Sequence, residues 1–197
     1  MCQFESIDIM DIKLKKKLKS LALLNAIIEP EWEYRYYSYN STWGKNEEMA
    51  SLRDSCGGEW FIWFSDDLIG FKCTSPVDGL VSDFANLINQ LPDSYAPFIN
   101  EPAFSMDNGS AIWYIESGVW KKYGVNIADL PTPESVIKMS AKDFCVFAEE
   151  MYEVELDEQI VGKILEGQFE FEMASALNSD IDISELKKEL LEIGIST

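Results

Sequence analysis

The chain has 197 residues, with 35 Asp and Glu against 16 Lys and Arg, which gives a formal charge of −19, and it contains no histidine. The absence of histidine excludes Ser–His and Cys–His mechanisms and metal sites with histidine ligands. The acidic excess argues against nucleic-acid binding, which needs a basic surface. Because 47% of the residues are apolar and 13% are aromatic, we expect a folded protein with a sizeable core.

The N-terminal segment carries a run of lysines followed by the apolar residues 21–28. Asn25 interrupts these residues, and Glu29 and Pro30 follow without a small-residue cleavage site, so a secretion signal is disfavoured. The apolar run is also too short to span a bilayer. Four widely spaced cysteines are typical of reduced cytosolic thiols, namely Cys2, Cys56, Cys73 and Cys145. We therefore expect a cytoplasmic protein without a membrane partner.

The first quarter of the chain predicts a helix followed by an aromatic strand. Over residues 11–28, apolar residues recur at helical spacing, on the stripe Leu14, Leu18, Leu21, Leu24 and Ile28. Pro30 ends this helix because the residue before a proline avoids the helical region. Over residues 31–43, alternation indicates a strand with one apolar face, formed by Trp32, Tyr34 and Tyr36. Residues 45–53 are polar, and we expect a loop with one helical turn.

The middle of the chain predicts a hairpin. Residues 59–64 are almost wholly apolar, which is typical of a strand buried on both faces. Asp66 and Asp67 indicate a turn into a partner strand over residues 68–73.

Helical spacing then predicts a helix over residues 79–91 that stops at Pro92, followed by a short helical turn over 92–99. Residues 110–116 are expected to form a further strand. Residues 118–133 are expected to be irregular and form the only plausible linker, because they are interrupted by Gly124, Pro131 and Pro133.

From residue 134 onward the periodicity is helical only. Ser140 is expected to cap the first of these helices, and further helices are expected around residues 160–165 and 169–177. Asp182 is expected to cap the last helix and Gly194 to end it.

A strand-rich region over residues 31–116 that precedes a helical region over 134–197 predicts an α+β fold. We expect an antiparallel sheet of about four to six strands. The N-terminal helix and the helical region would pack on this sheet, within a single domain over residues 1–197.

Five polar residues near the last helix stand at the spacing of a calcium loop, namely Asn178, Asp180, Asp182, Ser184 and Glu189. Ile183 occupies the position that requires glycine, so capping by Asp182 is the favoured interpretation. Cysteines without histidine do not predict a zinc site, and the chain has no phosphate-binding or nucleophile motif. We expect no metal, no cofactor and no catalytic residue.

Paired carboxylates leave one enzymatic alternative open. Glu47, Glu48, Asp54 and Glu59 lie around the aromatic strands, and tryptophans often line sugar sites. A glycosidase needs two carboxylates at a defined separation, although with 35 acids some pair always occurs. A carboxylate-based enzyme or a carbohydrate-binding protein is therefore the alternative hypothesis.

The aromatic segments are the most distinctive feature of the sequence. Residues 60–64 are assigned to the core. The strand before them suits either a core or an exposed binding face, because Trp, Tyr and Arg dominate interface hot spots. The candidate binding residues are Tyr34, Arg35, Tyr37, Asn40, Trp43, Glu48, Arg53 and Asp54.

The acidic residues concentrate in the C-terminal region. Residues 143–197 hold 15 acids and three lysines. The densest run is the candidate surface for a basic partner, and it consists of Glu149, Glu150, Glu153, Glu155, Asp157 and Glu158.

Two aromatic stretches carry a family resemblance. Residues 32–43 read WEYRYYSYNSTW and residues 48–61 read EMASLRDSCGGEWF. They resemble a family of bacterial cytosolic proteins with the pattern W-E-Y-R-Y-Y-S-x-N-S-x-W, then M-A-S-M-R-D-G-x-G-D-E-Y-F. Leu91–Asp93, Glu101–Met106 and Leu191–Gly194 also fit, whereas Ser55 and Gly58 replace the family's Gly and Asp. The family supplies no activity to carry over.

The acidic character of the family is similar to that of bacterial toxin-immunity proteins. Leu91–Tyr95, with Phe98, is similar to the L-P-x-x-Y element of the SUKH immunity superfamily. The resemblance implies a non-enzymatic, immunity-like module that binds a basic protein such as a toxin. A third hypothesis is an accessory domain that is acidic for solubility alone. The oligomeric state is open.

Overall fold

The structure is a computed structural model that describes residues 7–54, 56–75, 79–127 and 130–196, so Cys2 and Ser55 lie outside the described residues. The chain divides into two compact units. Unit 1 comprises residues 1–41 and 132–197, and unit 2 comprises residues 42–131. The expectation of a single domain stays a prediction. None of the described helices is both long enough and apolar enough to cross a membrane.

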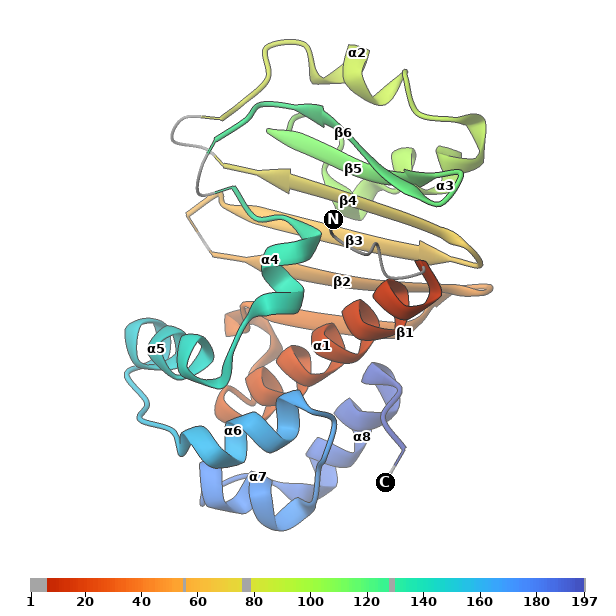
Figure 1. Cartoon of the computed structure of the whole chain (residues 1–197). Helices are drawn as coiled ribbons and strands as arrows, with labels where there is room; N and C mark the ends of the chain where they lie inside the picture. The colour runs from red at the N-terminus through yellow and green to blue at the C-terminus, as the bar shows by residue number, and fades with distance from the viewer. Residues whose placement is uncertain (1–6, 55, 76–78, 128–129, 197) are drawn as a thin grey trace, which may run out of the picture. The chain divides into compact units, whose positions relative to one another are not determined.

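Six strands form one antiparallel sheet in which each strand pairs with the next along the chain (Figure 1). This arrangement confirms the α+β class and the expected antiparallel sheet. The strands are β1 Tyr37–Gly44, β2 Glu47–Arg53, β3 Glu59–Ser65, β4 Leu68–Thr74, β5 Ala111–Glu116 and β6 Val119–Gly124.

The hairpin of β3 and β4 forms as the sequence predicts. Ser65 pairs with Leu68 across a turn in which Asp66 has a positive φ of 47°. The five central residues of β3, Trp60–Phe64, are all buried, which confirms burial on both faces. The register places Trp63 of β3 beside Gly70 of β4.

One face of the unit 2 sheet is covered by short helical segments between β4 and β5. These segments are α2 Phe84–Ile88, η2 Asp93–Tyr95, α3 Ala96–Ile99 and η3 Pro102–Phe104. Phe98 stacks on Trp63 with ring centroids 5.8 Å apart, and both rings belong to the core cluster of this face. The helical turn expected over residues 92–99 is confirmed.

Tyr95 extends the pairing of β4 and β5 beyond their last backbone pair, Gly70 with Tyr114. Its hydroxyl donates to the carbonyl of Ile115 at 2.7 Å and accepts from the Ile115 N–H at 3.0 Å. Burial raises the pKa of this hydroxyl, so it stays protonated and remains a donor. The side chain thus satisfies the backbone groups of Ile115, which β6 pairs through Trp120 but β4 does not pair.

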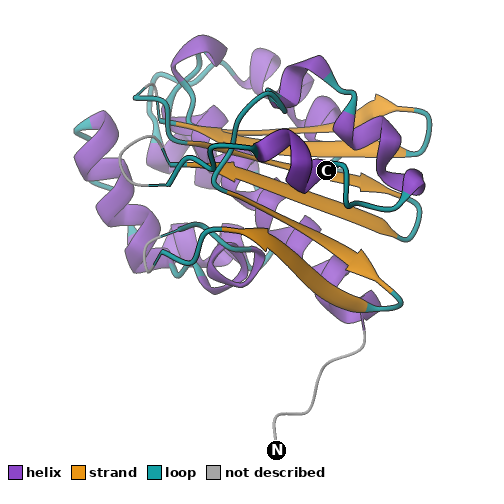
Figure 2. Ribbon diagram, turned by 90° about the horizontal axis from the view of Figure 1, so that it is seen from above, coloured by secondary structure: helices purple, strands orange, loops and turns teal. Residues whose placement is uncertain are grey.

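The described residues of unit 1 form α-helices, the 3-10 helix η1 Trp32–Tyr34 and the beginning of β1. Figure 2 shows the helices of the chain in purple and its strands in orange. The central helix of unit 1, α1, contacts α4, α6, α7 and α8. Asp182 begins α8 by accepting from the N–H groups of Ser184 and Glu185, and Gly194 ends it at a φ of 75°, as expected. The helices are α1 Ile7–Ile28, α4 Pro133–Lys138, α5 Ala141–Tyr152, α6 Glu158–Leu165, α7 Phe171–Leu177 and α8 Ile183–Ile193.

The strand expected over residues 31–43 begins only at Tyr37, and this boundary was wrong. Residues 32–34 form η1, which reverses the chain after α1 and shifts the phase of the alternation. β1 therefore buries Tyr37 and Tyr39. The sequence pattern instead predicts a strand whose apolar face consists of Trp32, Tyr34 and Tyr36.

Three further expectations are corrected. Residues 47–53 form β2 rather than a loop with a helical turn, because pairing with β3 overrides their polar composition. The helix expected over 79–91 is limited to α2, because the Val81 N–H donates to the Gly109 carbonyl and keeps the preceding chain non-helical. Part of the expected linker forms β6 after a two-residue turn whose residues both have a positive φ, Ser117 and Gly118.

Gly70 is required by the close approach of Phe98, because a Cβ at residue 70 would lie 2.5 Å from the Phe98 ring. We expect Gly70→Ala to lower the free energy of unfolding by about 1–3 kcal/mol through overpacking. A Cβ at Gly162, inside α6, would make an ordinary 3.7 Å contact with Ala141. Gly162→Ala is the matched control and should raise stability by about 0.5–1 kcal/mol. Urea denaturation measures both, and equal effects would contradict this packing.

Removal of the Tyr95 hydroxyl leaves the buried N–H and carbonyl of Ile115 without their partner. We expect Tyr95→Phe to lower the free energy of unfolding by about 1–3 kcal/mol. Tyr34→Phe alters an exposed tyrosine and should stay within about 0.5 kcal/mol. Thermal unfolding compares the two variants, and a neutral Tyr95→Phe would show that the hydroxyl does not support the strand pair.

Candidate functional site

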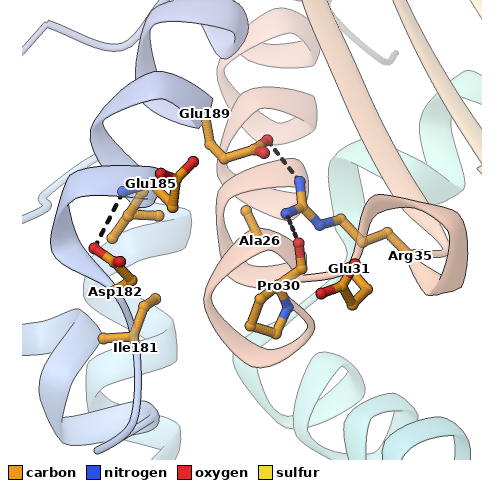
Figure 3. Close-up of a pocket in the computed structure, with 9 residues that line it drawn as sticks. Ala26, Pro30, Glu31, Arg35, Ile181, Asp182, Glu185 and Glu189 are labelled. Atoms are coloured by element: carbon orange, nitrogen blue, oxygen red, sulfur yellow. Dashed lines mark hydrogen bonds and ion pairs between the residues drawn. The ribbon is translucent and has the colours of Figure 1, made fainter.

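Arg35 holds the turn that follows α1. Its Nε donates to the Glu29 carbonyl at 2.7 Å and its Nη2 donates to the Pro30 carbonyl at 2.5 Å. Its Nη1 bonds the Glu189 carboxylate of α8 at 2.6 Å (Figure 3). Because carbonyls beyond a helix end lack partners in the helix, a guanidinium in this position satisfies them while also pairing with a carboxylate.

Beside Arg35 lies a pocket of about 280 Å³ within unit 1. Glu31 and Arg35 come from the turn after α1, whereas Glu185 and Glu189 come from α8 (Figure 3). The apolar part of the lining includes buried Ala26. The complete lining consists of Ala26, Pro30, Glu31, Arg35, Ile181, Asp182, Glu185, Leu186 and Glu189.

The lining carries four carboxylates against one guanidinium. Glu189 pairs with Arg35, Asp182 caps α8, and Glu185 pairs with Lys188 at 2.7 Å on the surface. The carboxylate of Glu31 has no hydrogen-bond or ion-pair partner among the described residues. The pocket is therefore electronegative, and part of this charge is not neutralised by the chain.

Two aromatic side chains stand exposed on the same turn. Trp32 is 56% exposed and Tyr34 is 61% exposed. Trp32 also lines a shallow depression with Arg35 and Glu189, two residues that line the pocket as well. The depression therefore borders the pocket, and Trp32 lines the depression but not the pocket itself.

The far end of the turn is fixed by Asn25 of α1. Its Oδ1 accepts from the N–H groups of Tyr36 and Tyr37 at 3.1 Å. The Tyr152 hydroxyl donates to the same Oδ1 at 2.8 Å. Burial raises the pKa of Tyr152 to about 12, so this donor stays protonated. The pocket wall is thus held at both ends of residues 29–37.

Four of the candidate binding residues lie in unit 1, in different environments. Tyr34 is exposed, whereas the Arg35 side chain is only 5% exposed. Tyr37 is buried, its hydroxyl lies 3.6 Å from the Met139 Sδ, and burial raises its pKa. Asn40 donates to the Glu192 carboxylate at 3.2 Å.

The other four candidates lie in unit 2. Trp43 stacks on Phe104, and the Arg53 guanidinium lies 5.3 Å from the Phe61 ring centroid. Glu48 is half-buried in β2. The eighth residue, Asp54, accepts from two N–H groups of its own turn. The eight residues are therefore divided between the units.

Lys72 is a further residue of interest, and its buried side chain lies inside unit 2. Its Nζ donates to the Glu59 carboxylate at 2.9 Å and to the Ser105 carbonyl at 3.1 Å. Burial lowers the pKa of Lys72, and the bond to Glu59 opposes that shift. No sequence signal marks the residue, because a lysine on a strand normally faces solvent.

The six acids of the candidate partner surface are all exposed. They occupy the end of α5, the connection to α6 and the first turn of α6, which Asp157 caps. Within the described part of the chain, none of the six forms an ion pair. Asp182 caps α8, as the sequence predicts. The described residues contain no group of three or more Cys, Asp or Glu placed to hold a metal ion.

Comparison with protein-family models, curated proteins and solved structures finds no match for this chain.

Replacement of Arg35 tests whether its planar fork holds the turn. Arg35→Lys keeps the charge but cannot make all three bonds, so we expect a loss of about 1–3 kcal/mol in unfolding free energy. Arg53→Lys is the matched control, because Arg53 is exposed, and its effect should stay within about 0.5 kcal/mol. Chemical denaturation measures both, and a neutral Arg35→Lys would contradict the proposed structural role.

Proposed function

We propose that this chain is a non-enzymatic protein-binding module of the cytoplasm, similar in role to bacterial immunity proteins. Its acidic surface binds a basic protein such as a toxin. The proposal rests on one observation: six exposed carboxylates gather over residues 149–158, and no described cation pairs with them. Charge left without a partner within the chain is available to attract an opposite charge.

Two further considerations support a binding role over a catalytic one. Asp54 is engaged in its own turn, and Glu59 pairs with Lys72, so two of the four carboxylates considered for catalysis already have structural partners. The resemblance of residues 32–43 and 48–61 to the bacterial family favours the same conclusion. A −19 chain also repels the phosphate backbone of nucleic acids, which disfavours that class of partner.

The test is the salt dependence of binding to the basic proteins encoded by neighbouring genes. We expect reversal of Glu149, Glu150 and Glu153 to lysine to lower the association rate about tenfold or more at low salt. The matched control reverses three exposed acids elsewhere, Glu172, Asp180 and Asp67, and should have a much smaller effect. Stopped-flow kinetics measures these rates. Absence of binding, insensitivity to salt, or equal effects of the two triple variants would contradict the proposal.

A further inference from the structure

The pocket beside Arg35 has the dimensions of a site for one side chain. Its volume of about 280 Å³ lies at the lower limit of the range of about 300–1,000 Å³ that is typical of pockets for small-molecule ligands. The buried residues Ala26 and Leu186 supply an apolar part of its lining. A pocket of this size and lining accommodates one long side chain with an aliphatic stem.

The charge of the lining selects a cation. Glu31 has no partner among the described residues, and the exposed pair of Glu185 with Lys188 is of the weak surface kind. Arg35 does not cancel this charge, because it contributes one positive charge against four carboxylates. Glu31 and Glu185 line the pocket from the turn after α1 and from α8, so a cationic side chain in the pocket has carboxylates on both walls (Figure 3).

Trp32 distinguishes between the two cationic side chains. Its indole is largely exposed and lines the adjoining depression together with Arg35 and Glu189. A guanidinium is planar, stacks on aromatic faces and donates in pairs to carboxylates, whereas an ammonium is a compact and strongly hydrated charge. The combination of an exposed indole and facing carboxylates therefore suits arginine.

We propose that the pocket between the turn 30–35 and α8 receives an arginine side chain of the basic partner, with Glu31 and Glu185 at its guanidinium and Trp32 against its face. This inference rests on the proposed function and names the anchor point of that interaction. The aliphatic stem of the arginine covers Ala26 and Leu186. The acids of residues 149–158 then attract the partner, whereas this pocket fixes its position.

The experiment is an NMR titration with a short capped peptide whose single arginine is flanked by glycines. We expect saturable shifts at the Trp32 indole and at the backbone amides of Glu31 and Glu185. The same peptide with citrulline keeps the shape without the charge and should produce no such shifts. Glu31→Gln and Trp32→Ala should each weaken binding about two- to fivefold. Glu172→Gln, which alters an exposed acid of α7, should leave the affinity unchanged.

Three outcomes of the titration would contradict the inference. Equal shifts from the citrulline peptide, or shifts confined to residues 149–158, would overturn it, as would the absence of saturable shifts. Both altered side chains are on the exposed turn, so circular dichroism of the variants checks that the fold is kept. If the full partner binds Glu31→Gln and Trp32→Ala as tightly as the unaltered chain, the pocket is not the anchor and the proposed function still stands. If reversal of Glu149, Glu150 and Glu153 alone has no effect, the proposed function fails instead.

Discussion

Burial of the second half of α1 on all sides is the constraint on which unit 1 depends. Every residue from Ser20 to Ile27 is buried, so its polar groups cannot rely on water. The Ser20 hydroxyl donates to the Ile164 carbonyl of α6, and the Asn178 side chain donates to the Ile27 carbonyl. Asn25 accepts from the chain that enters β1. These contacts of Ser20, Asn25 and the Ile27 carbonyl each fix one neighbouring segment to α1.

The same constraint shapes the candidate site. Because Asn25 holds Tyr36 and Tyr37 while Arg35 holds the Glu29 and Pro30 carbonyls, the segment between them has little freedom. The aromatic side chains of η1 therefore face solvent beside an acidic pocket instead of joining the core. An exposed indole whose backbone is already held loses less entropy on binding than one on a free loop, which is favourable for an anchor point.

Sequence patterns within a few neighbouring residues predict the elements that those residues themselves stabilise. Asp182 and Gly194 placed α8, and the apolar run of residues 59–64 placed β3, because caps and continuous burial leave a direct pattern. β2 and β6 were missed because their formation depends on pairing with a neighbouring strand. The pocket was missed because Glu185 and Glu189 are about 150 residues from Arg35 in sequence, and only α1 and α8 bring them together. The sequence marks Arg35 as a candidate binding residue because arginine is frequent at interface hot spots. Its bonds to the Glu29 and Pro30 carbonyls depend on a turn that the alternating pattern of residues 31–43 does not predict.

The central claim is that the buried polar contacts of α1 preform the pocket. Hydrogen exchange in Asn25→Leu tests it most directly, because leucine keeps a side chain of similar size but removes the acceptor of the Tyr37 amide, whereas the Tyr36 amide keeps the Tyr152 hydroxyl as a second acceptor. The account predicts faster exchange at the Tyr37 amide and weaker binding of the arginine peptide, while Ser20→Ala, which alters a different α1 contact, leaves this amide protected. Unchanged protection and unchanged affinity in Asn25→Leu would contradict it.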